Sequence, residues 1–427
     1  MKVMLLNPPV FQYIGYQHRM NPPLGLPILA AVLRNAGHTA EVADLEALGV
    51  SPDRLRHVWA AQRESWPDLV GLTCLTSSAR GCREAIAAIR EAGYDGRIAV
   101  GGVHATLFPE EPLSWGADLV VTGECEGNIV QALEAGAKGI VRGVQADLAL
   151  IPPPAWGFHS PPPAAYQGNA PFIGRPEAIV MMSRGCPHRC IFCGNTIFGG
   201  LATRYRPPDA IEAELRGLKD MGIRALFEYS DELVGGPMPA GWMEELADRI
   251  GPLGLVWKAQ GRCSRKHVDR GLLEAAHRAG ARVLMWGVES FSQRVLDASK
   301  KGTAVEDIWH TLRLTKEAGI KNWLFTMVGN YREEMSDLAI TAQCLREAYL
   351  AGLVDYRQTT VVTPMAGTEL EAIQKREGWY VAPPEAGPQM NQVYTGTPWL
   401  TPKEIEYWLR KFDEACPADW QGRRAAA

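Results

Sequence analysis

Three cysteines within one short segment carry the clearest chemical signal of this sequence. Cys186, Cys190 and Cys193 are spaced as Cys-x3-Cys-x2-Cys. Three thiolates on one loop can ligate three irons of a [4Fe-4S] cluster and leave the fourth iron open to an exchangeable ligand, whereas ferredoxin-type clusters use four cysteines. A structural zinc site also needs four ligands, so Cys125 or His188 would have to complete one here. The spacing therefore favours a cluster with one open iron over zinc.

The same segment resembles the signature of the radical S-adenosylmethionine (radical SAM) superfamily, because an aromatic residue, Phe192, directly precedes the third cysteine. The resemblance implies that Cys186, Cys190 and Cys193 hold a [4Fe-4S] cluster whose open iron is chelated by the amino and carboxylate groups of S-adenosylmethionine. One electron from the cluster would then split the sulfonium to a 5′-deoxyadenosyl radical. An electron donor such as flavodoxin or ferredoxin is implied as a partner, and Phe192 is expected beside the bound S-adenosylmethionine.

The composition is typical of a globular protein without nucleic-acid or membrane features. The chain has 427 residues, of which 46% are hydrophobic, and a formal net charge of −4. This length predicts two domains with an appendage. Lysine and arginine are dispersed, so no nucleic acid is expected as a partner. The apolar run before Asn7 is too short for a signal peptide, and no later segment is long enough to span a bilayer. We therefore expect a cytoplasmic protein with no membrane partner.

The first 145 residues alternate short apolar runs with helical patterns, which predicts an N-terminal Rossmann-like, doubly wound parallel sheet. The expected strands are residues 2–6, 40–43, 69–73, 98–100 and 119–122. The expected helices are residues 25–35, 52–62, 78–92 and 126–135. A sheet of this kind binds its ligand at the carboxyl ends of its strands, near the point where the strand order reverses. Paired glycines and hydroxyl side chains follow these strands, and they allow a ligand to approach the backbone.

The loops at these strand ends resemble the cobalamin-binding domain that precedes the barrel in B12-dependent radical SAM enzymes. The shared segments are Asn-Pro-Pro at 7–9, Pro-Leu-Gly-Leu at 23–26, Asp-Leu-Val-Gly-Leu-Thr at 68–73, Gly-Gly-Val-His-Ala-Thr at 101–106 and Val-Thr-Gly-Glu-Cys-Glu at 121–126. The resemblance implies a cobalamin site that contains Thr73, Leu75, Thr76, Ser77, Gly101, Gly102, His104, Gly123 and Glu124.

The sequence departs from B12 domains of the methionine-synthase type in one respect. Those domains ligate cobalt through the histidine of an Asp-x-His-x-x-Gly motif, and no histidine of this chain has an aspartate two residues before it. Our interpretation is a base-off cobalamin with no histidine below the metal, where Leu75 or its neighbours cover that face. His104 is expected to shape the glycine turn rather than to ligate cobalt.

The second half is predicted to form the open, TIM-type (β/α)6 partial barrel associated with radical SAM enzymes. Strand patterns occur at residues 178–183, 225–229, 255–259, 283–287, 323–328 and 356–362, with amphipathic helices such as 209–221 and 266–279 between them. Proline clusters at 152–154 and 161–163 indicate a stiff connector before the barrel. The expected parts are the B12-binding domain at 1–145, a linker at 146–175, the barrel at 176–375 and a small C-terminal cap at 376–427.

Polar residues follow three of the predicted barrel strands, where βα barrels place their reactive groups. The resemblance implies that these strand ends contact S-adenosylmethionine through Ser230, Asp231, Glu232, Gln260, Arg262, Glu289 and Ser290. Carboxylate and hydroxyl acceptors at 230–232 suit the methionine ammonium, and Arg262 suits its carboxylate. Glu289 and Ser290 lie in a segment close to the family's Gly-x-Glu-Ser-Gly, in which Phe291 replaces the last glycine.

Taken together, the resemblances predict a class B (B12-dependent) radical SAM methyltransferase. It would transfer a methyl group from S-adenosylmethionine, via methylcobalamin, to an unactivated carbon or phosphorus of a small-molecule or peptide substrate. The alternative is a B12-dependent cyclase or ring-rearranging enzyme without net methyl transfer. Methylthiolation of transfer RNA would need additional cluster cysteines and a basic appendage, which this sequence lacks. The intact cysteine triad and the polar strand ends disfavour a non-catalytic B12 carrier or sensor.

Overall fold

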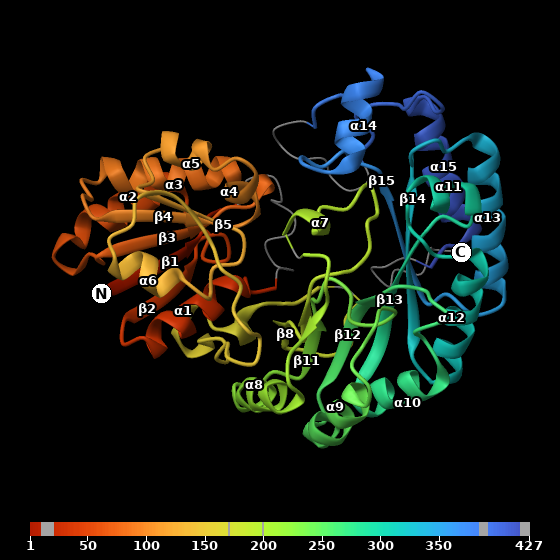
Figure 1. Cartoon of the computed structure of the whole chain (residues 1–427), viewed down its shortest axis with the longest axis horizontal. Coiled ribbons are helices and arrows are strands. Elements are labelled where there is room, and N and C mark those ends of the chain that lie inside the picture. The colour runs from red at the N-terminus through yellow and green to blue at the C-terminus, as the bar shows by residue number, and fades with distance from the viewer. Residues whose placement is uncertain (10–20, 170, 199, 384–391, 419–427) are drawn as a thin grey trace. The chain divides into compact units, whose positions relative to one another are not determined.

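The computed structural model describes residues 1–9, 21–169, 171–198, 200–383 and 392–418. The chain divides into two compact units (Figure 1). Unit 1 consists of Met1–Asn169, Pro176–Ile179 and Arg216–Ile223, and unit 2 consists of Ala170–Arg175, Val180–Leu215 and Arg224–Ala427. The limits of the linker and of the cap that we inferred from the sequence remain predictions.

Unit 1 is built on a seven-stranded sheet in which every strand pair is parallel. In spatial order the strands are β6 (Gly139–Arg142), β5 (Leu119–Thr122), β4 (Arg97–Gly101), β3 (Leu69–Thr73), β1 (Lys2–Asn7), β2 (Thr39–Asp44) and β7 (His159–Ser160). The order reverses at β1, which pairs with both β2 and β3. The predicted doubly wound sheet is therefore confirmed, with its switch point beside β1.

Two edge strands of this sheet, β6 and β7, were not predicted from the sequence. The side chains of β6 alternate between half-buried and exposed, and β7 has only two residues. Neither has the continuous apolar run that marks a buried parallel strand. β7 lies within segment 146–175, and Tyr166 of the same segment donates a hydrogen bond from its hydroxyl to buried Asp44 at 2.7 Å. This part of the expected linker is thus an element of the sheet.

Helices cover both faces of the sheet, because neighbouring residues of a strand point to opposite sides and both sides are apolar. Leu6 and Val70 pack with Ile86 in one core, whereas Leu5 and Leu69 pack in another. The first core lies under α2 and α3, and the second lies under α1 and α6. The helices of this unit are α1 (Gly25–Asn35), α2 (Pro52–Ala61), α3 (Ala79–Glu91), α4 (Val103–Leu107), α5 (Glu110–Ser114) and α6 (Ile129–Glu134).

The second sheet has six strands, and its spatial order follows the chain in one direction. The strands are β15 (Tyr356–Val361), β14 (Lys321–Val328), β13 (Ala281–Glu289), β12 (Val256–Gly261), β11 (Ala225–Glu228) and β8 (Glu177–Val180). Strands β11 to β15 pair in parallel with their neighbours, and β8 and β15 remain the two edges. A parallel βα sheet with two open edges is the predicted partial barrel.

A separate antiparallel pair flanks the cysteine segment. β9 (Ser183–Arg184) pairs with β10 (Arg204–Tyr205), so residues 185–203 leave and return at one place. The described part of this loop contains α7 (Asn195–Phe198). The sequence predicted one strand over 178–183, but β8 ends at Val180 and the chain resumes as β9. The interruption matters for the site, because backbone N–H groups at this point donate to side-chain oxygens and not to a neighbouring strand.

The remaining helices connect the strands of the second sheet. They are α8 (Pro208–Asp220), α9 (Trp242–Ile250), α10 (Arg270–Arg278), α11 (Gln293–Ala298), α12 (Val305–Glu317), α13 (Met335–Leu350), α14 (Glu369–Glu377) and α15 (Pro402–Ala415). Side-chain oxygens of Asp269, Thr368 and Thr401 cap the first turns of α10, α14 and α15.

Helix α15, which we expected in the C-terminal cap, packs on α13, β14 and β15. Arg357 of β15 donates to the carbonyl oxygen of Cys416 at 3.0 Å and pairs with Asp413. Phe412 is fully buried. The helix is thus an integral part of unit 2. Residues 384–391 and 419–427 of the predicted cap lie outside the described residues.

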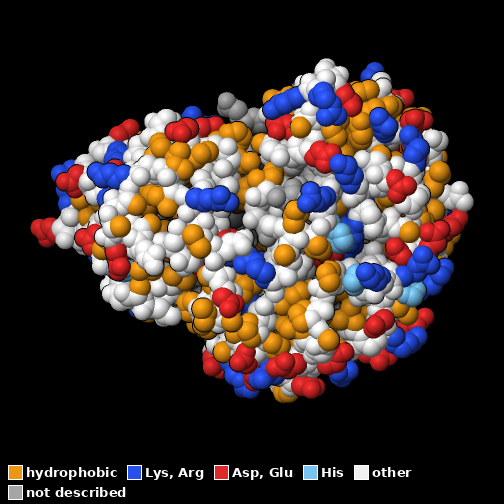
Figure 2. Space-filling view, viewed as in Figure 1, with side chains coloured by type: hydrophobic (Ala, Val, Ile, Leu, Met, Phe, Trp, Pro, Cys, Tyr) orange, Lys and Arg blue, Asp and Glu red, His pale blue; other side chains and the backbone are white. Residues whose placement is uncertain are grey.

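The surface agrees with a dispersed distribution of charge. Acidic and basic side chains are interspersed over the face shown in Figure 2. Within the described residues, no helix combines the length and the apolarity that crossing a membrane requires.

A buried asparagine joins the central strands of the second sheet to two neighbouring segments. Asn322 of β14 is fully buried. Its Nδ2 donates to the carbonyl oxygens of Leu312 and Leu353, both at 2.9 Å, and its Oδ1 accepts a hydrogen bond from Nε1 of Trp286 at 2.8 Å. One side chain thus satisfies three buried polar groups.

Replacing Asn322 by alanine should therefore destabilise unit 2. The change leaves the buried indole N–H of Trp286 without its partner, removes one hydrogen bond from each of two carbonyl oxygens and opens a cavity in the core, and an unpaired buried N–H alone costs about 1–3 kcal/mol. We expect a loss of about 3 kcal/mol or more, measured as a lower midpoint in urea or thermal unfolding. Lys321→Ala alters the preceding, exposed residue and should stay within about 0.5 kcal/mol of the wild type. Equal stability of the two variants would contradict this account.

Candidate functional site

Backbone hydrogen bonds hold the cysteine loop in place. The N–H of Cys186 donates to the carbonyl oxygen of Gly200 at 3.3 Å, and the N–H of Cys193 donates to that of Cys190 at 3.1 Å. Ile191, between these two cysteines, donates to Ser299, and its own carbonyl oxygen accepts from the N–H of Leu370 at 2.8 Å. The three sequence-predicted cysteines therefore belong to one fixed loop that is anchored by residues distant in the sequence.

Two of the three thiols of this loop, those of Cys190 and Cys193, have a positive or an N–H partner. Nη1 of Arg262 lies 3.8 Å from Sγ of Cys190, and both residues are buried. The backbone N–H of Asn195 donates to Sγ of Cys193 at 3.5 Å. Donors of this kind stabilise thiolates, which are the form that binds iron.

Side chains at the carboxyl end of β11 hold the strand that leads into the loop. The N–H of Met182 donates to Oε1 of Glu228 at 2.9 Å, and the N–H of Ser183 donates to Oγ of Ser230 at 2.8 Å. The N–H of Gly185, immediately before the first cysteine, donates to Oδ2 of Asp231 at 2.7 Å. These acceptors replace the regular strand ladder at this point. We call Glu228, Ser230 and Asp231 the loop clamp.

Glu228 is the central member of the loop clamp and was not among the residues predicted from the sequence. It is fully buried, and its Oε1 also accepts from the N–H of Ser230 at 3.2 Å and from the hydroxyl of Ser230. Burial raises the pKa of Glu228 to about 7, because the interior disfavours the carboxylate, although the donors of Ser230 and Met182 act in the opposite direction. A glutamate at a strand end gives no distinctive sequence signal. Its position two residues before Ser230 is the only hint.

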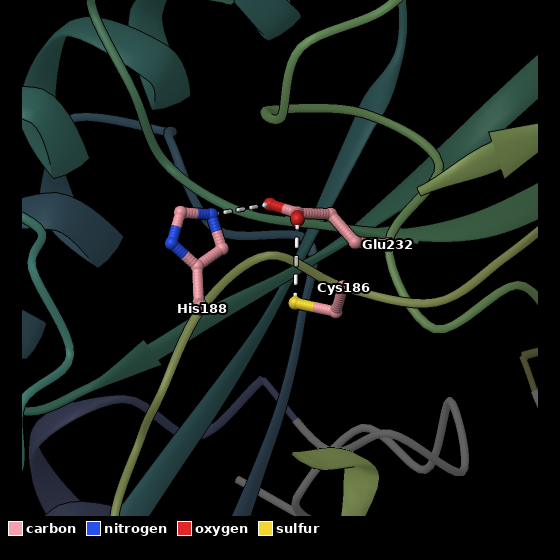
Figure 3. A group of neighbouring side chains, drawn as sticks. All are labelled: Cys186, His188 and Glu232. Atoms are coloured by element: carbon pink, nitrogen blue, oxygen red, sulfur yellow. Dashed lines mark hydrogen bonds and ion pairs between the residues drawn. The ribbon is translucent and has the colours of Figure 1, made fainter. Parts of the chain in front are cut away.

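Glu232 lies beside the first cysteine (Figure 3). Its Oε2 is 3.4 Å from Sγ of Cys186, and its Oε1 is 3.3 Å from Nε2 of His188. Burial raises the pKa of the Cys186 thiol to about 12, and the neighbouring Glu232 carboxylate adds to the increase. Ser230, Asp231 and Glu232, which the resemblance assigned to the methionine ammonium, all contact the cysteine segment, and their assignment to S-adenosylmethionine remains a prediction.

Two buried cations lie at the ends of β12 and β13. Besides Arg262, Lys301 is buried and donates from Nζ to Oε1 of Glu289 at 2.9 Å. Glu289 has a φ of 62°, and the pairing register of β13 and β14 shifts between Gly287 and Glu289. A bulge with a left-handed non-glycine residue redirects a side chain and is typical of functional sites. A Cβ atom on Gly287 would lie 2.8 Å from both Glu289 Oε1 and Lys301 Nζ, so a side chain there would displace the pair.

The other predicted contacts of S-adenosylmethionine lie in different surroundings. The hydroxyl of Ser290 is fully buried, with Oγ 3.1 Å from Oγ1 of Thr341 on α13. Phe192 is partly buried against an apolar cluster that includes Leu370. Gln260 is half-buried at the end of β12. Ser290 and Phe192 thus have structural contacts, which sequence reasoning could not distinguish from ligand contacts.

The residues of this region fit an iron–sulfur cluster. Three thiols come from one anchored loop, and the buried guanidinium of Arg262 adjoins one of them. A cluster with three thiolates is anionic, so a buried cation next to it is favourable. Cys186, Cys190 and Cys193 are the residues that would hold it. Such a cluster supplies one-electron reduction when S-adenosylmethionine is bound to it.

In unit 1, the loops after β3 and β4 approach each other closely. Thr73 pairs with Gly101 in the strand register, and the N–H of His104 donates to the carbonyl oxygen of Cys74 at 2.9 Å. Gly102 has a φ of 104°, and a Cβ there would lie 2.8 Å from that carbonyl oxygen. The structure therefore brings the predicted residues Thr73, Gly101 and Gly102 together at the switch-point edge.

The other predicted cobalamin residues lie on loops at strand ends of this sheet. Leu75 is 45% exposed, and Thr76 and Ser77 begin a short helical turn after it. Gly123 has a φ of 75° and donates from its N–H to Oγ1 of Thr106 at 2.8 Å. Glu124 accepts a hydrogen bond from Gln145 at 3.1 Å. An exposed leucine among backbone donors suits a flat, partly apolar ligand.

His104 is held against α5. Its Nε2 lies 3.3 Å from Oε2 of Glu111, and its ring stacks on Trp115 with centroids 5.9 Å apart. The side chain is buried, and its Nδ1 has no hydrogen-bond partner within the described residues. That His104 shapes the glycine turn remains a prediction, consistent with the bond from its own N–H to Cys74.

Comparison with known proteins agrees with this geometry. Residues 19–133 match the model of the B12 binding domain, and residues 180–345 match that of the radical SAM superfamily. An uncharacterized methyltransferase of Pyrococcus horikoshii is 25% identical over 396 residues, which are 87% of this chain and 82% of the relative. The anaerobic magnesium-protoporphyrin IX monomethyl ester cyclase of Cereibacter sphaeroides is 27% identical over 357 residues, 77% of this chain and 56% of the cyclase. The chain thus spans just over half of that cyclase's length.

Among solved structures, the radical S-adenosylmethionine methyltransferase TsrM from Kitasatospora setae superposes with a TM-score of 0.70 at 19% identity, covering 95% of this chain and 82% of TsrM. At this identity the likeness concerns the fold. A chain that carries a B12-binding domain and a radical SAM domain is a radical SAM enzyme that uses cobalamin, a [4Fe-4S] cluster and S-adenosylmethionine. The protein belongs to the cobalamin-dependent radical SAM enzymes, which also need a source of electrons.

Removing one acceptor of the loop clamp should impair cluster assembly. Ser230→Ala leaves the N–H of Ser183 without its partner, at a cost of about 1–3 kcal/mol, and frees the backbone before Cys186. We expect bound iron per chain after anaerobic reconstitution to fall to roughly half or less, measured by iron and sulfide analysis and by the electron paramagnetic resonance of the reduced protein.

The matched control for this variant is Ser292→Ala. Ser292 is also buried, but its hydroxyl donates to Asp337 on α13 at 2.7 Å. It should lose comparable stability and retain its iron. Equal iron content in the two variants would show that the loop clamp does not position the cysteine loop.

The glycine pair of unit 1 offers a second matched test. Gly102→Ala forces alanine into a left-handed backbone with a Cβ 2.8 Å from the Cys74 carbonyl, which should cost about 1–3 kcal/mol or more. Gly101→Ala places its Cβ at 3.6 Å from the Val121 carbonyl, an ordinary contact. Thermal unfolding should show a clear loss for the first variant alone, and similar midpoints for both would refute the tight approach.

Proposed function

We propose that the protein is a cobalamin-dependent radical SAM methyltransferase. It transfers a methyl group from S-adenosylmethionine to an unactivated carbon or phosphorus of a small-molecule or peptide substrate. The observation that carries the proposal is that one chain matches both the B12 binding domain and the radical SAM superfamily. In addition, the relative from Pyrococcus horikoshii, of which this chain covers 82%, is named a methyltransferase. TsrM, whose fold is similar, is also described as a methyltransferase.

In this proposal the cofactors supply the reactivity, with the cluster and S-adenosylmethionine as radical source and cobalamin as methyl carrier. The chain's residues bind and orient them. Cys186, Cys190 and Cys193 ligate the cluster, and the loop clamp fixes the loop that carries them. Because the residues already hold the cofactors in place, less entropy is lost when the reacting groups are oriented.

For the methionine part of S-adenosylmethionine we favour Gln260, Arg262 and Glu289 as direct contacts. Nη2 of Arg262 is buried and has no hydrogen-bond partner within the described residues, so it can receive a carboxylate. Glu289 is available for an ammonium, with Lys301 holding its other side. Ser230, Asp231 and Ser290 act by positioning, because their side chains bond to the protein itself.

The cobalamin is proposed to bind base-off at the switch-point edge of unit 1. Leu75 would cover the lower face of the metal, because it is exposed on the loop after β3. His104 would not ligate cobalt, because Glu111 and Trp115 hold its ring. A flavodoxin or ferredoxin would deliver the electrons, in the cytoplasm.

The second candidate is a cyclase or ring-rearranging enzyme. The relative from Cereibacter sphaeroides favours this candidate, because it is named a cyclase. Its sequence identity to this chain is 27%, against 25% for the methyltransferase of Pyrococcus horikoshii, although the chain covers only 56% of the cyclase. The domain matches are shared by both candidates and do not separate them.

The two candidates differ in the fate of the methyl group. Under anaerobic reduction with methyl-labelled S-adenosylmethionine, a methyltransferase should place label on its bound cobalamin, whereas a cyclase should release 5′-deoxyadenosine and leave the cobalamin unlabelled. The Cys186→Ala, Cys190→Ala, Cys193→Ala triple variant should release no 5′-deoxyadenosine, measured by chromatography. Unlabelled cobalamin in the wild type would overturn the proposal in favour of the cyclase.

A further inference from the structure

Cys186 belongs to a second set of potential metal ligands. Sγ of Cys186, Nε2 of His188 and a carboxylate oxygen of Glu232 all lie within 4.8 Å of one another. Figure 3 shows the imidazole and the thiol each facing a different oxygen of the carboxylate. Two ligands come from the cysteine loop and one follows β11, so the set is a product of the fold.

The separations match the edges of a tetrahedral metal site. Zinc binds sulfur at about 2.3 Å and nitrogen or oxygen at about 2.0–2.1 Å, which places tetrahedral ligand atoms about 3.3–3.6 Å apart. The observed distances are 3.4 Å from Cys186 Sγ to Glu232 Oε2 and 3.3 Å from His188 Nε2 to Glu232 Oε1, so each partner meets a different carboxylate oxygen. One ligand atom from each of the three residues lies within 4.8 Å of the other two. Side-chain rotations that shorten these separations to the tetrahedral edge would place all three ligand atoms around one ion.

Two of the ligand atoms lack ordinary hydrogen bonds. Glu232 is only 4% exposed, and neither its Oε1 nor Nε2 of His188 forms a hydrogen bond within the described residues, since their contact meets the distance but not the geometry of one. Buried polar atoms are almost always hydrogen-bonded or bound to an ion. The atoms that remain unsatisfied are those that point toward one another in Figure 3.

The donor types define the class of ion. A thiolate, an imidazole and a carboxylate suit borderline divalent ions such as Zn²⁺ and Fe²⁺, whereas Mg²⁺ and Ca²⁺ prefer oxygen ligands alone. Binding would release the thiol proton of Cys186, and the positive ion would compensate the thiolate formed in this way together with the adjacent Glu232 carboxylate.

We propose that the cluster-free enzyme binds one borderline divalent ion, Zn²⁺ or Fe²⁺, through Cys186, His188 and Glu232, with water as the fourth ligand. Cys190 and Cys193 take no part. The single ion and the cluster exclude each other, because both require Cys186, so the ion must leave or be incorporated before the cluster is complete. The inference rests on the proposed function only in assigning Cys186 to the cluster.

The test uses Co²⁺ as a spectroscopic substitute for Zn²⁺. Anaerobic titration of the cluster-free full-length chain should give one Co²⁺ per chain, with a thiolate-to-metal charge-transfer band and the intense visible bands of a four-coordinate ion, which Zn²⁺ should abolish. His188→Gln and Glu232→Gln should each weaken binding about tenfold or more. Cys190→Ala and Cys193→Ala are the matched controls, and they should bind Co²⁺ as the wild type does.

Three outcomes would overturn the proposal. Loss of Co²⁺ binding in Cys190→Ala or Cys193→Ala would assign the ion to the cysteines alone. Unchanged binding in His188→Gln would leave only a local hydrogen-bonded cluster. Binding of Co²⁺ by fully reconstituted enzyme would show that the two metals do not share Cys186. Circular dichroism excludes misfolding as a cause, and the labelling of cobalamin is measured separately, so failure here leaves the proposed methyl transfer standing.

Discussion

The loop clamp is the constraint on which the cysteine site depends. A strand edge normally satisfies its N–H groups through a neighbouring strand. From the end of β8 to the residue after β9, three N–H groups instead bond to the side chains of Glu228, Ser230 and Asp231. A side chain can place an acceptor where no strand can reach, so the backbone leaves the sheet without losing hydrogen bonds. The loop that follows starts from a fixed point, and the fixed point is one residue before Cys186.

Both units apply the same rule of parallel sheets, although their chemistry differs. Strands of a parallel sheet end at a common edge, and side chains that follow them converge there. In unit 1 this edge combines a tight glycine turn with an exposed leucine, which suits a large flat ligand. In the second sheet it combines thiols with buried cations, which suits an anionic cluster. One architecture thus provides two unlike binding surfaces.

Much of the fold could be predicted from the sequence, because buried parallel strands are apolar runs with clear helical segments between them. Strands β3 and β5 and helix α1 have the predicted bounds. The edge strands β6 and β7 were not predicted, because a half-exposed strand and a two-residue strand lack a continuous apolar run. The three cysteines were found from their spacing alone, which the structure gathers on one loop.

The roles of individual strand-end residues were harder to predict. A polar residue after a strand can contact a ligand or the protein itself, and spacing does not distinguish these cases. Ser230 and Ser290 bond to their own unit, whereas Arg262 retains a buried donor without a partner. The roles of Glu228 and Lys301 become visible only in the folded structure. Glu228 bonds to Met182, which is distant in the sequence, and Lys301 bonds to Glu289, which lies at a bulge.

The pairing of β7 with β2 has a practical consequence for dissecting the molecule. Val42 and Ala43 pair with His159 and Ser160, and Tyr166 closes over Asp44. A corrin-binding fragment that ends at residue 145, before the predicted linker, would leave β2 as an unpaired sheet edge and would expose the buried carboxylate of Asp44. Such an edge invites self-association. A fragment that extends to Asn169 keeps β7 paired with β2 and keeps Tyr166 bonded to Asp44. It contains all seven strands of this sheet.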